Sequence, residues 1–183
     1  MARKVVLADA SPLIALARVG GLPWLRELYK TISITKEVRG EATGARELPG
    51  AVAIAAAVKQ GWIRVLRQVW REPPLLQLDT GEASTLRAAI ALGPRTLVLL
   101  DDLQARREAQ RLGIMMTGTA GIIVEARQAG LIPAAGPVFA RLSEEGFHLG
   151  DDLLQAILYE SEDSKGARHQ DPAGPARARR PGS

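Results

Sequence analysis

The sequence has 183 residues, of which 46% are hydrophobic and 24% are charged, and it contains two histidines and no cysteine. This length is typical of one domain with a substantial hydrophobic core. The lack of cysteine excludes disulfides, zinc–thiolate sites and cysteine nucleophiles, and two histidines are too few for a histidine-rich metal site. A bound metal would therefore have oxygen ligands, which favours Mg²⁺ or Mn²⁺.

The net charge of +4 is concentrated near the C-terminus. Residues 164–183 carry all of this charge, so the rest of the chain is close to neutral. The segment is rich in Gly, Pro, Ala and Arg, and it has almost no large apolar side chains to offset the entropy of ordering. We expect a folded domain over 1–162 and a disordered basic tail over 163–183. The charge of this tail either adds nonspecific attraction to phosphate or is incidental.

The N-terminal segment lacks the features of an export signal. Basic residues precede an apolar run, but Asp9 interrupts this run well before it reaches the length of a signal-peptide core. No other apolar run is long enough to span a bilayer. Together with the lack of cysteine, these features indicate a cytoplasmic protein with no membrane partner.

The first half of the chain alternates short apolar runs with helical patterns. Residues 5–8 (VVLA) form a predicted strand, and Ser11 followed by Pro12 predicts an N-cap with proline in the first helical position. A Gly-Gly pair at 20–21 separates the two helices that follow. In order, the expected elements are strand 5–8, helices 11–19 and 21–29, strand 31–34, a helix from residue 36, helix 50–60 and an edge strand at 62–66.

The second half continues this alternation after a loop marked by two consecutive prolines. The expected elements are helix 79–92, strand 96–100, a helix that follows Asp101-Asp102 and ends at 112, strand 114–117, and helices 119–129, 134–145 and 151–160. Strands that are apolar on both faces and alternate with helices predict a parallel sheet covered on both sides. We therefore expect the α/β class, with a three-layer α/β/α sandwich around a central, mainly parallel sheet.

Two of the predicted strands end in carboxylates, Asp9 after strand 5–8 and Asp101-Asp102 after strand 96–100. Ligands of parallel sheets collect beyond the carboxyl ends of the strands, where the strand order reverses, so neighbouring strands would bring these acids into one crevice. Crowded carboxylates repel one another unless a cation or solvent compensates them, which indicates a divalent-metal site with oxygen ligands. The alternative is that Asp9 is only a structural cap of the next helix.

Two glutamates are further candidates for this site. Glu41 lies one helical step after Val38, so it lies near the core-facing side if Val38 is buried. Glu37 is its rival, and both glutamates also fit an ordinary solvated helix. Glu82 follows Asp79 by three residues, which is the spacing of a capping box and a structural alternative to metal binding.

Five short motifs occur in order over roughly residues 4–160. They are Asp9-Ala10-Ser11-Pro12-Leu13-Ile14, Val38-Arg39-Gly40-Glu41, Leu78-Asp79-Thr80-Gly81-Glu82-Ala83, Leu99-Leu100-Asp101-Asp102 with Ala105-Arg106, and Thr117-Gly118-Thr119 before Ala129-Gly130-Leu131-Ile132. Together they resemble the PIN-domain nucleases, and more narrowly the bacterial and archaeal branch that is similar to VapC-type toxins. The resemblance implies an α/β/α fold and metal-dependent cleavage of RNA phosphodiester bonds.

The resemblance also implies an acidic site in this sequence. Its members would be Asp9, Glu41, Glu82 and one aspartate of the Asp101-Asp102 pair. Asp102 is the favoured metal ligand because it stands three residues before Ala105, where relatives often have an apolar residue after their acid, and Asp101 is its competitor. Ser11 matches a hydroxyl of the family near the first acid, which could orient Asp9 as well as cap its helix.

We predict a hydrolytic reaction without a covalent enzyme intermediate. Asp9 and Asp102 would bind Mg²⁺ or Mn²⁺ directly, and the two glutamates would act through water, hold a second ion or accept the proton of the attacking water. Arg106 and Arg107 would hold the RNA backbone at the edge of the site, although an ordinary exposed helix explains both arginines equally well.

The resemblance further implies an RNA substrate, a small antitoxin protein as partner, and a homodimer. Helices 11–19 and 50–60 could supply the contact surfaces, or their apolar faces could be buried within this domain. Two other functions stay open. One is a noncatalytic PIN-like interaction module that keeps its acids for stability or partner binding. The other is a phosphatase similar to the haloacid dehalogenases, which would need a second aspartate where this chain has Ser11.

Overall fold

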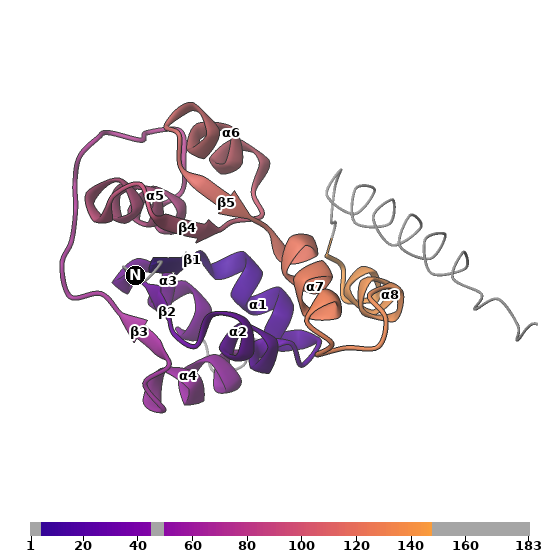
Figure 1. The fold of residues 1–183 in the computed structure, drawn as a ribbon. Coiled ribbons are helices and arrows are strands. Elements are labelled where there is room, and N and C mark those ends of the chain that lie inside the picture. Colours follow the sequence, from indigo (N-terminus) through magenta and orange to yellow (C-terminus); the bar gives the residue numbers. More distant parts are fainter. Residues whose placement is uncertain (1–4, 45–49, 148–183) are drawn as a thin grey trace, which may run out of the picture.

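The structure is a computed structural model that describes residues 5–44 and 50–147. Its centre is a five-stranded sheet in the order β3-β2-β1-β4-β5, and every pair of neighbouring strands is parallel (Figure 1). The strands are β1 (Val5–Ala8), β2 (Ile32–Ile34), β3 (Ile63–Val65), β4 (Thr96–Leu99) and β5 (Met115–Thr117). The predicted parallel sheet is therefore confirmed.

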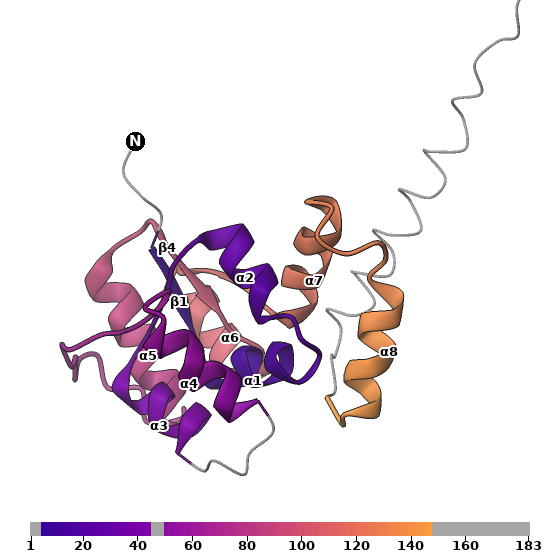
Figure 2. The same ribbon diagram turned by 90° about the horizontal axis from the view of Figure 1, so that it is seen from below.

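Helices cover both faces of this sheet. In the described part of the chain they are α1 (Ala10–Arg18), α2 (Leu22–Tyr29), α3 (Lys36–Thr43), α4 (Ala51–Lys59), α5 (Thr80–Leu92), α6 (Leu103–Arg111), α7 (Thr119–Gln128) and α8 (Gly136–Glu144). One hydrophobic core joins α5 and α6 to the sheet, and a second core joins the other helices to its opposite face. The expected α/β/α sandwich is thus confirmed, with α8 at one end of the molecule (Figure 2).

The two central strands contribute side chains to both cores. Leu7 and Val98 are buried against α5 and α6, whereas Val6 and Leu97 are buried in the opposite core. Successive side chains of a strand point to opposite faces, so a run of consecutive apolar residues fills both cores at once. For this reason the segments VVLA and TLVL form interior strands of a parallel sheet.

The outer strands are less enclosed. β3 is an edge strand, as the sequence predicts for residues 62–66. β5 is the other edge strand, and Met115 in it is 44% exposed. The predicted strand at residues 114–117 is confirmed, but its side chains are exposed or half-buried, whereas those of the two central strands are mostly buried.

The first helix begins earlier than predicted. α1 starts at Ala10, and Asp9 occupies the N-cap position with extended backbone angles. Ser11, the predicted cap, is instead the second residue of the helix, so this prediction is wrong. Pro12 is the third helical residue, where its missing N–H costs little because the first N–H groups of a helix have no acceptor within it. The carboxylate of Asp9, not the hydroxyl of Ser11, thus stands at the junction of strand and helix.

Some predictions fall on other parts of the chain. The predicted helix 151–160 and the predicted tail 163–183 lie outside the described residues, so the domain boundary at 162 stays a prediction. Within residues 5–44 and 50–147, no helix combines the length and the apolar character needed to cross a membrane.

The strand order reverses between β1 and β4, which pair in register along their whole length. Backbone hydrogen bonds continue past the strand ends, from Asp9 N to Leu99 O at 3.0 Å and from Leu100 N to Thr117 O at 2.9 Å. The residues that follow β1 and β4 therefore emerge side by side at the carboxyl edge of the sheet. This edge is where ligands of parallel α/β sheets bind.

Buried hydroxyl groups tie α3 to the first turn of α5. The Oγ1 atom of Thr35 accepts a hydrogen bond from Val38 N at 3.2 Å and lies 2.7 Å from the Oγ atom of Ser84. Ser84 donates its own hydrogen to the carbonyl oxygen of Gly81 at 2.8 Å, so Thr35 is the donor in the bond between the two hydroxyls. This chain of bonds holds α3 against the N-terminus of α5.

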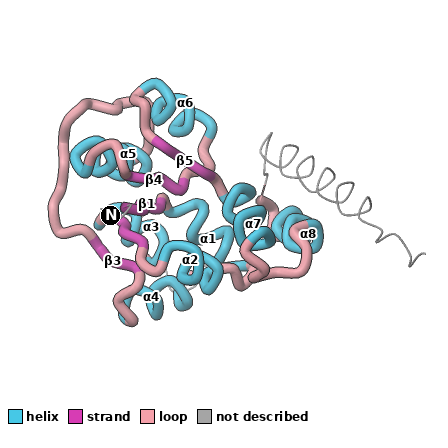
Figure 3. Tube along the Cα trace, viewed as in Figure 1, coloured by secondary structure: helices cyan, strands magenta, loops and turns pink. Residues whose placement is uncertain are grey.

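A long connection carries the chain from one face of the sheet to the other. Residues 66–79, between β3 and α5, contain no helix or strand and pass over the edge of the sheet toward α6 (Figure 3). The side chain of Gln104 in α6 donates a hydrogen bond to the carbonyl oxygen of Gln77 at 3.0 Å. The end of this connection is thereby fixed beside α6.

Candidate active site

Acidic side chains from four separate segments lie close enough at the carboxyl edge of the sheet for their charges to interact. The charges of Asp79 and Glu82 raise the pKa of Asp9, and the charges of Asp79, Asp102 and Glu41 raise the pKa of Glu82. We call these five residues, Asp9, Glu41, Asp79, Glu82 and Asp102, the acidic cluster. It contains all four of the acids that the sequence favours for the site, together with one that sequence reasoning treated only as a helix cap.

Asp9 is the most deeply buried member of the acidic cluster. It is 3% exposed, and its Oδ1 atom has no hydrogen-bond partner among the described residues. Burial raises the pKa of its carboxyl to about 7, the backbone amides of Ala10 and Ser11 offset part of this rise, and the charges of neighbouring acids add to it. An ionised carboxylate without a partner is costly in such a place, so this position favours either a proton or a bound cation.

Glu82 takes part in the capping box that its spacing predicts. Its backbone N–H donates to Oδ1 of Asp79 at 2.8 Å, and its Oε2 atom accepts from the backbone N–H of Asp79 at 3.2 Å. Burial is the largest cause that raises the pKa of Glu82 to about 7. The capping role therefore exists, and it coexists with a place in the acidic cluster, because Glu82 is buried and the charges of three other acids act on it.

Glu41 reaches the N-terminus of α5 because Gly81 has no side chain. A Cβ atom placed on Gly81 would lie 2.5 Å from Oε2 and 2.7 Å from Oε1 of Glu41. Burial raises the pKa of Glu41, the charges of Asp79 and Glu37 raise it further, and the backbone amide of Gly81 lowers it. Of the two rival glutamates on α3, Glu41 is thus the one that contacts the first turn of α5.

The two aspartates after β4 have different surroundings. Asp101 is directed to the start of α7, where its carboxylate accepts hydrogen bonds from the backbone N–H of Thr119 at 2.7 Å and from the Thr119 hydroxyl at 2.6 Å. Asp102 is the N-cap of α6, and its Oδ1 atom accepts a bond from Ala105 N at 2.8 Å. The charge of Asp102 also raises the pKa of Glu82, which is why Asp102 is counted in the acidic cluster.

The remaining predicted positions lie at the margin of the site. The Ser11 side chain is exposed, and its backbone amide is the group that acts on Asp9, so an orienting role for its hydroxyl stays a prediction. Arg106 donates from Nη1 to the carbonyl oxygen of Leu100 at 2.9 Å and thereby ties α6 to the end of β4. Arg107 is exposed on the same helix.

Sequence reasoning missed Asp79 and Gly81 as parts of this site. Asp79 stood out only as an N-cap, because a capping box accounts fully for an aspartate three residues before a glutamate. Gly81 matters because it leaves room for Glu41, a contact between α3 and α5 that no local pattern reports. The sequence feature that could have identified them is the segment Asp79-Thr80-Gly81-Glu82, in which two acids flank a threonine and a glycine at a helix start.

The chemistry of the acidic cluster fits a divalent cation. It supplies only carboxylate oxygens, the ligands that Mg²⁺ and Mn²⁺ prefer, and one of them is buried without a partner. As placed, no three acidic or histidine side chains within the described residues are grouped closely enough to hold a metal ion. Glu82 and Asp102 each direct an oxygen to a helix start instead. The second oxygen of each carboxylate has no part in these capping bonds, so an ion can be held once the acidic side chains draw closer together.

Comparison with known protein families gives one match. Residues 5–163 match the model of a family described as PIN domain, which covers most of the chain and all five strands. A search of curated proteins finds no match.

The raised pKa of Asp9 predicts a pH-dependent difference in stability between the wild type and Asp9→Asn. The carboxyl of Asp9 ionises near pH 3.8 in the unfolded chain but only near pH 7 in the folded protein. Its contribution to stability is therefore complete below pH 3.8 and is lost as the pH rises to about 7. The asparagine does not titrate. Between pH 5 and pH 8, with EDTA present, we expect the variant to gain on the order of 2 kcal/mol in free energy of unfolding relative to the wild type. Urea denaturation at the two pH values measures this gain.

A control for this measurement is Glu144→Gln, on exposed α8 away from the acidic cluster. Its stability relative to the wild type should change much less over the same pH interval. If the difference between the wild type and Asp9→Asn does not depend on pH, then Asp9 is not a buried, titrating carboxyl group.

Proposed function

Because the chain belongs to the PIN domain family, whose members are generally nucleases, we propose that it is a metal-dependent ribonuclease. More narrowly, we propose that it belongs to the branch similar to VapC-type toxins and is the toxin of a toxin–antitoxin pair. The observation that carries the proposal is the buried Asp9 carboxylate, which has an unpartnered oxygen and lies among other acids at the reversal of strand order. Such a group fits a cation that would in turn bind phosphate.

The proposed cofactor is Mg²⁺ or Mn²⁺. When bound, such an ion stabilises the negative charge that develops on phosphate oxygens and lowers the pKa of bound water. Asp9 and Asp102 are the proposed direct ligands. They follow neighbouring strands, and Asp9 has a free oxygen while Asp102 directs one oxygen to its cap.

Glu82 and Glu41 have supporting roles in the proposed reaction. A carboxyl group with a pKa near 7 can accept a proton from an attacking water at neutral pH, and the pKa of Glu82 is raised to about 7. Glu41, held against Gly81, would orient that water or help to hold a second ion. Water is the proposed nucleophile, so the reaction needs no covalent enzyme intermediate.

An antitoxin partner and a homodimer also belong to this proposal. α1 is largely buried in the domain, so it offers less apolar surface to a partner than α4 does. α4 keeps apolar residues on its outer side, among them Val52, which is 70% exposed. The outer side of α4 is therefore the better candidate for a protein contact. A cytoplasmic location is proposed with the same function.

The proposed activity can be tested on a fluorescently labelled single-stranded RNA of mixed sequence. We expect cleavage with Mg²⁺ or Mn²⁺, none with EDTA, and none of the DNA with the same sequence. Asp9→Asn should lower the cleavage rate on the order of 100-fold or more, since it removes a charge that the developing transition state needs. Circular dichroism would verify that the variant is folded.

Glu144→Gln again serves as the matched control and should cleave like the wild type. Equal loss in both variants would mean that removal of any acidic side chain is sufficient, which contradicts a specific site. If the folded wild type cleaves no RNA with either ion, the chain is not the proposed ribonuclease, and a noncatalytic interaction module is the better description.

The contact between Glu41 and Gly81 generates a separate prediction. Gly81→Ala would push the Glu41 carboxylate away from α5, because the new Cβ atom needs the space that its oxygens occupy. We expect the cleavage rate to fall roughly 10-fold, the scale expected when a supporting group is displaced slightly. The matched control is Gly40→Ala, because nothing lies within 4 Å of a Cβ atom at that position. Equal cleavage rates in the two alanine variants would rule out a role for the placement of Glu41.

A further inference from the structure

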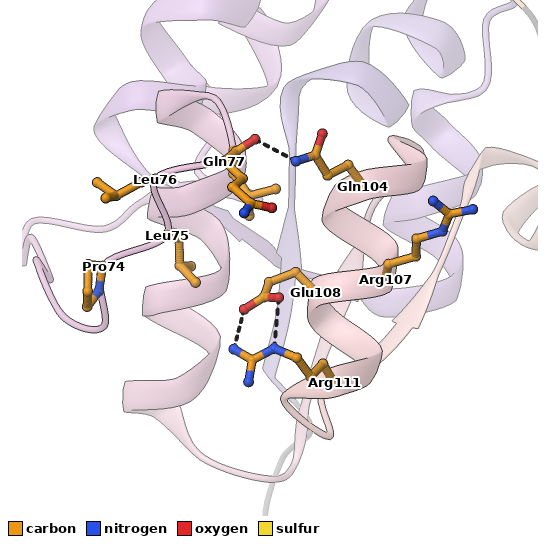
Figure 4. Close-up of a pocket in the computed structure, with 9 residues that line it drawn as sticks. Pro74, Leu75, Leu76, Gln77, Gln104, Arg107, Glu108 and Arg111 are labelled. Atoms are coloured by element: carbon orange, nitrogen blue, oxygen red, sulfur yellow. Dashed lines mark hydrogen bonds and ion pairs between the residues drawn. The ribbon is translucent and has the colours of Figure 1, made fainter.

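A groove lies between α6 and the segment 74–78, which ends the long connection before α5 (Figure 4). Its volume is about 690 Å³. Binding sites for small organic ligands commonly have volumes of roughly 300–1,000 Å³, so a single nucleotide fits the space. The groove has no part in the function proposed above, which involves only the acidic cluster.

The groove begins where the acidic cluster ends. Leu78 lines it and directly precedes Asp79, and Gln104 lines it two residues after Asp102. The bond from Gln104 Nε2 to Gln77 O, at 3.0 Å, joins the two walls at this end. Along α6, Glu108 stands six residues after Asp102, about 9 Å at the usual rise of an α-helix. A nucleotide next to a phosphate held at the acidic cluster would reach this groove.

The two walls of the groove differ in chemistry. Leu75 and Gln77 point from the segment toward α6, and Leu75 is buried in the hydrophobic core on this face of the sheet (Figure 4). Glu108 and Arg111 face them from α6 as an ion pair, with Arg111 Nε donating to Oε2 of Glu108 at 2.9 Å. One wall is thus partly apolar, and the other offers a carboxylate and a guanidinium side by side.

This combination fits a nucleobase better than a phosphate. A base has a flat apolar face for the half-buried Leu78 and hydrogen-bonding edges for the ion pair, whereas Glu108 would repel a phosphate. Guanine matches the pair best: its O6 and N7 atoms accept hydrogen bonds from arginine, and its neighbouring N–H groups can donate to a carboxylate. We propose that this groove holds one guanine of the RNA beside the cleaved phosphate, and that Glu108 is a specificity-determining residue. The proposal rests on the ribonuclease function proposed above.

The test compares cleavage of RNAs that differ only in the bases that flank the cleavage site. We expect the wild type to prefer guanine at one flanking position by about 10-fold, the scale of discrimination that one well-placed pair of hydrogen bonds provides. Glu108→Gln should reduce this preference to less than about 3-fold by lowering the rate on the guanine substrate. The matched control is Glu27→Gln, because Glu27 forms an exposed ion pair of the same spacing with Lys30 on another face. This variant should keep the preference.

Two outcomes would overturn the proposal: a wild type that cleaves with no base preference, or a preference that Glu108→Gln leaves unchanged. A binding measurement separates this failure from failure of the ribonuclease function. In NMR titrations of the wild type with 5′-GMP and, separately, 5′-CMP, we expect larger shifts with GMP at residues 75–78 and 104–111. These shifts should weaken in Glu108→Gln. GMP bound there without RNA cleavage would refute the function and keep the subsite, whereas shifts elsewhere in the protein would refute the subsite itself.

Discussion

The burial of one negative charge is the constraint on which the rest of this site depends. Asp9 ends a central strand and is almost fully enclosed, yet one of its oxygens lacks a partner among the described residues. The charges of two other acids, Asp79 and Glu82, act on it and disfavour its ionised form further. Burial is the largest cause that raises the pKa values of Asp9 and Glu82 to about 7, and the charges of neighbouring acids add to it, so without an ion these groups favour holding a proton.

Helix starts reduce the cost of this crowding. α1, α5 and α6 all begin beside the acidic cluster, and the N-terminus of a helix favours negative charge. The carboxylates of Glu82 and Asp102 benefit from this effect, since each accepts a hydrogen bond from a backbone N–H at the start of its helix. The same carboxylates are therefore helix caps in the structure described and proposed ligands when an ion is present. The two roles are compatible, because each capping bond, worth about 1 kcal/mol, occupies one carboxylate oxygen and leaves the other for an ion.

Much of the fold is predictable from local patterns. The segments VVLA and TLVL are apolar at every position except Thr96, and this identifies them as interior strands that acids follow. The sequence left open whether these two strands are neighbours at the reversal of strand order, and the structure shows that they are. The helix start at Ala10 was missed because Ser11-Pro12 is also a good cap signal, and the choice between the two depends on where the strand ends.

The finer parts of the site depend on contacts between segments that are distant in the sequence. Glu41 is distinguished from Glu37 by its contact with Gly81 on another helix, and Asp102 from Asp101 by the direction in which each carboxylate turns. The groove beside α6 exists because the chain passes over the sheet edge before α5, which no local periodicity indicates. Local patterns thus identify the candidate acids, and tertiary packing determines which of them lie close to one another.

The most direct test of the central claim is a crystal structure of the protein soaked with Mn²⁺, in which anomalous scattering locates the ion. The claim predicts an ion about 2.1 Å from carboxylate oxygens of both Asp9 and Asp102. Mn²⁺ found only at other surfaces, with the Asp9 carboxylate still unpartnered, would contradict it.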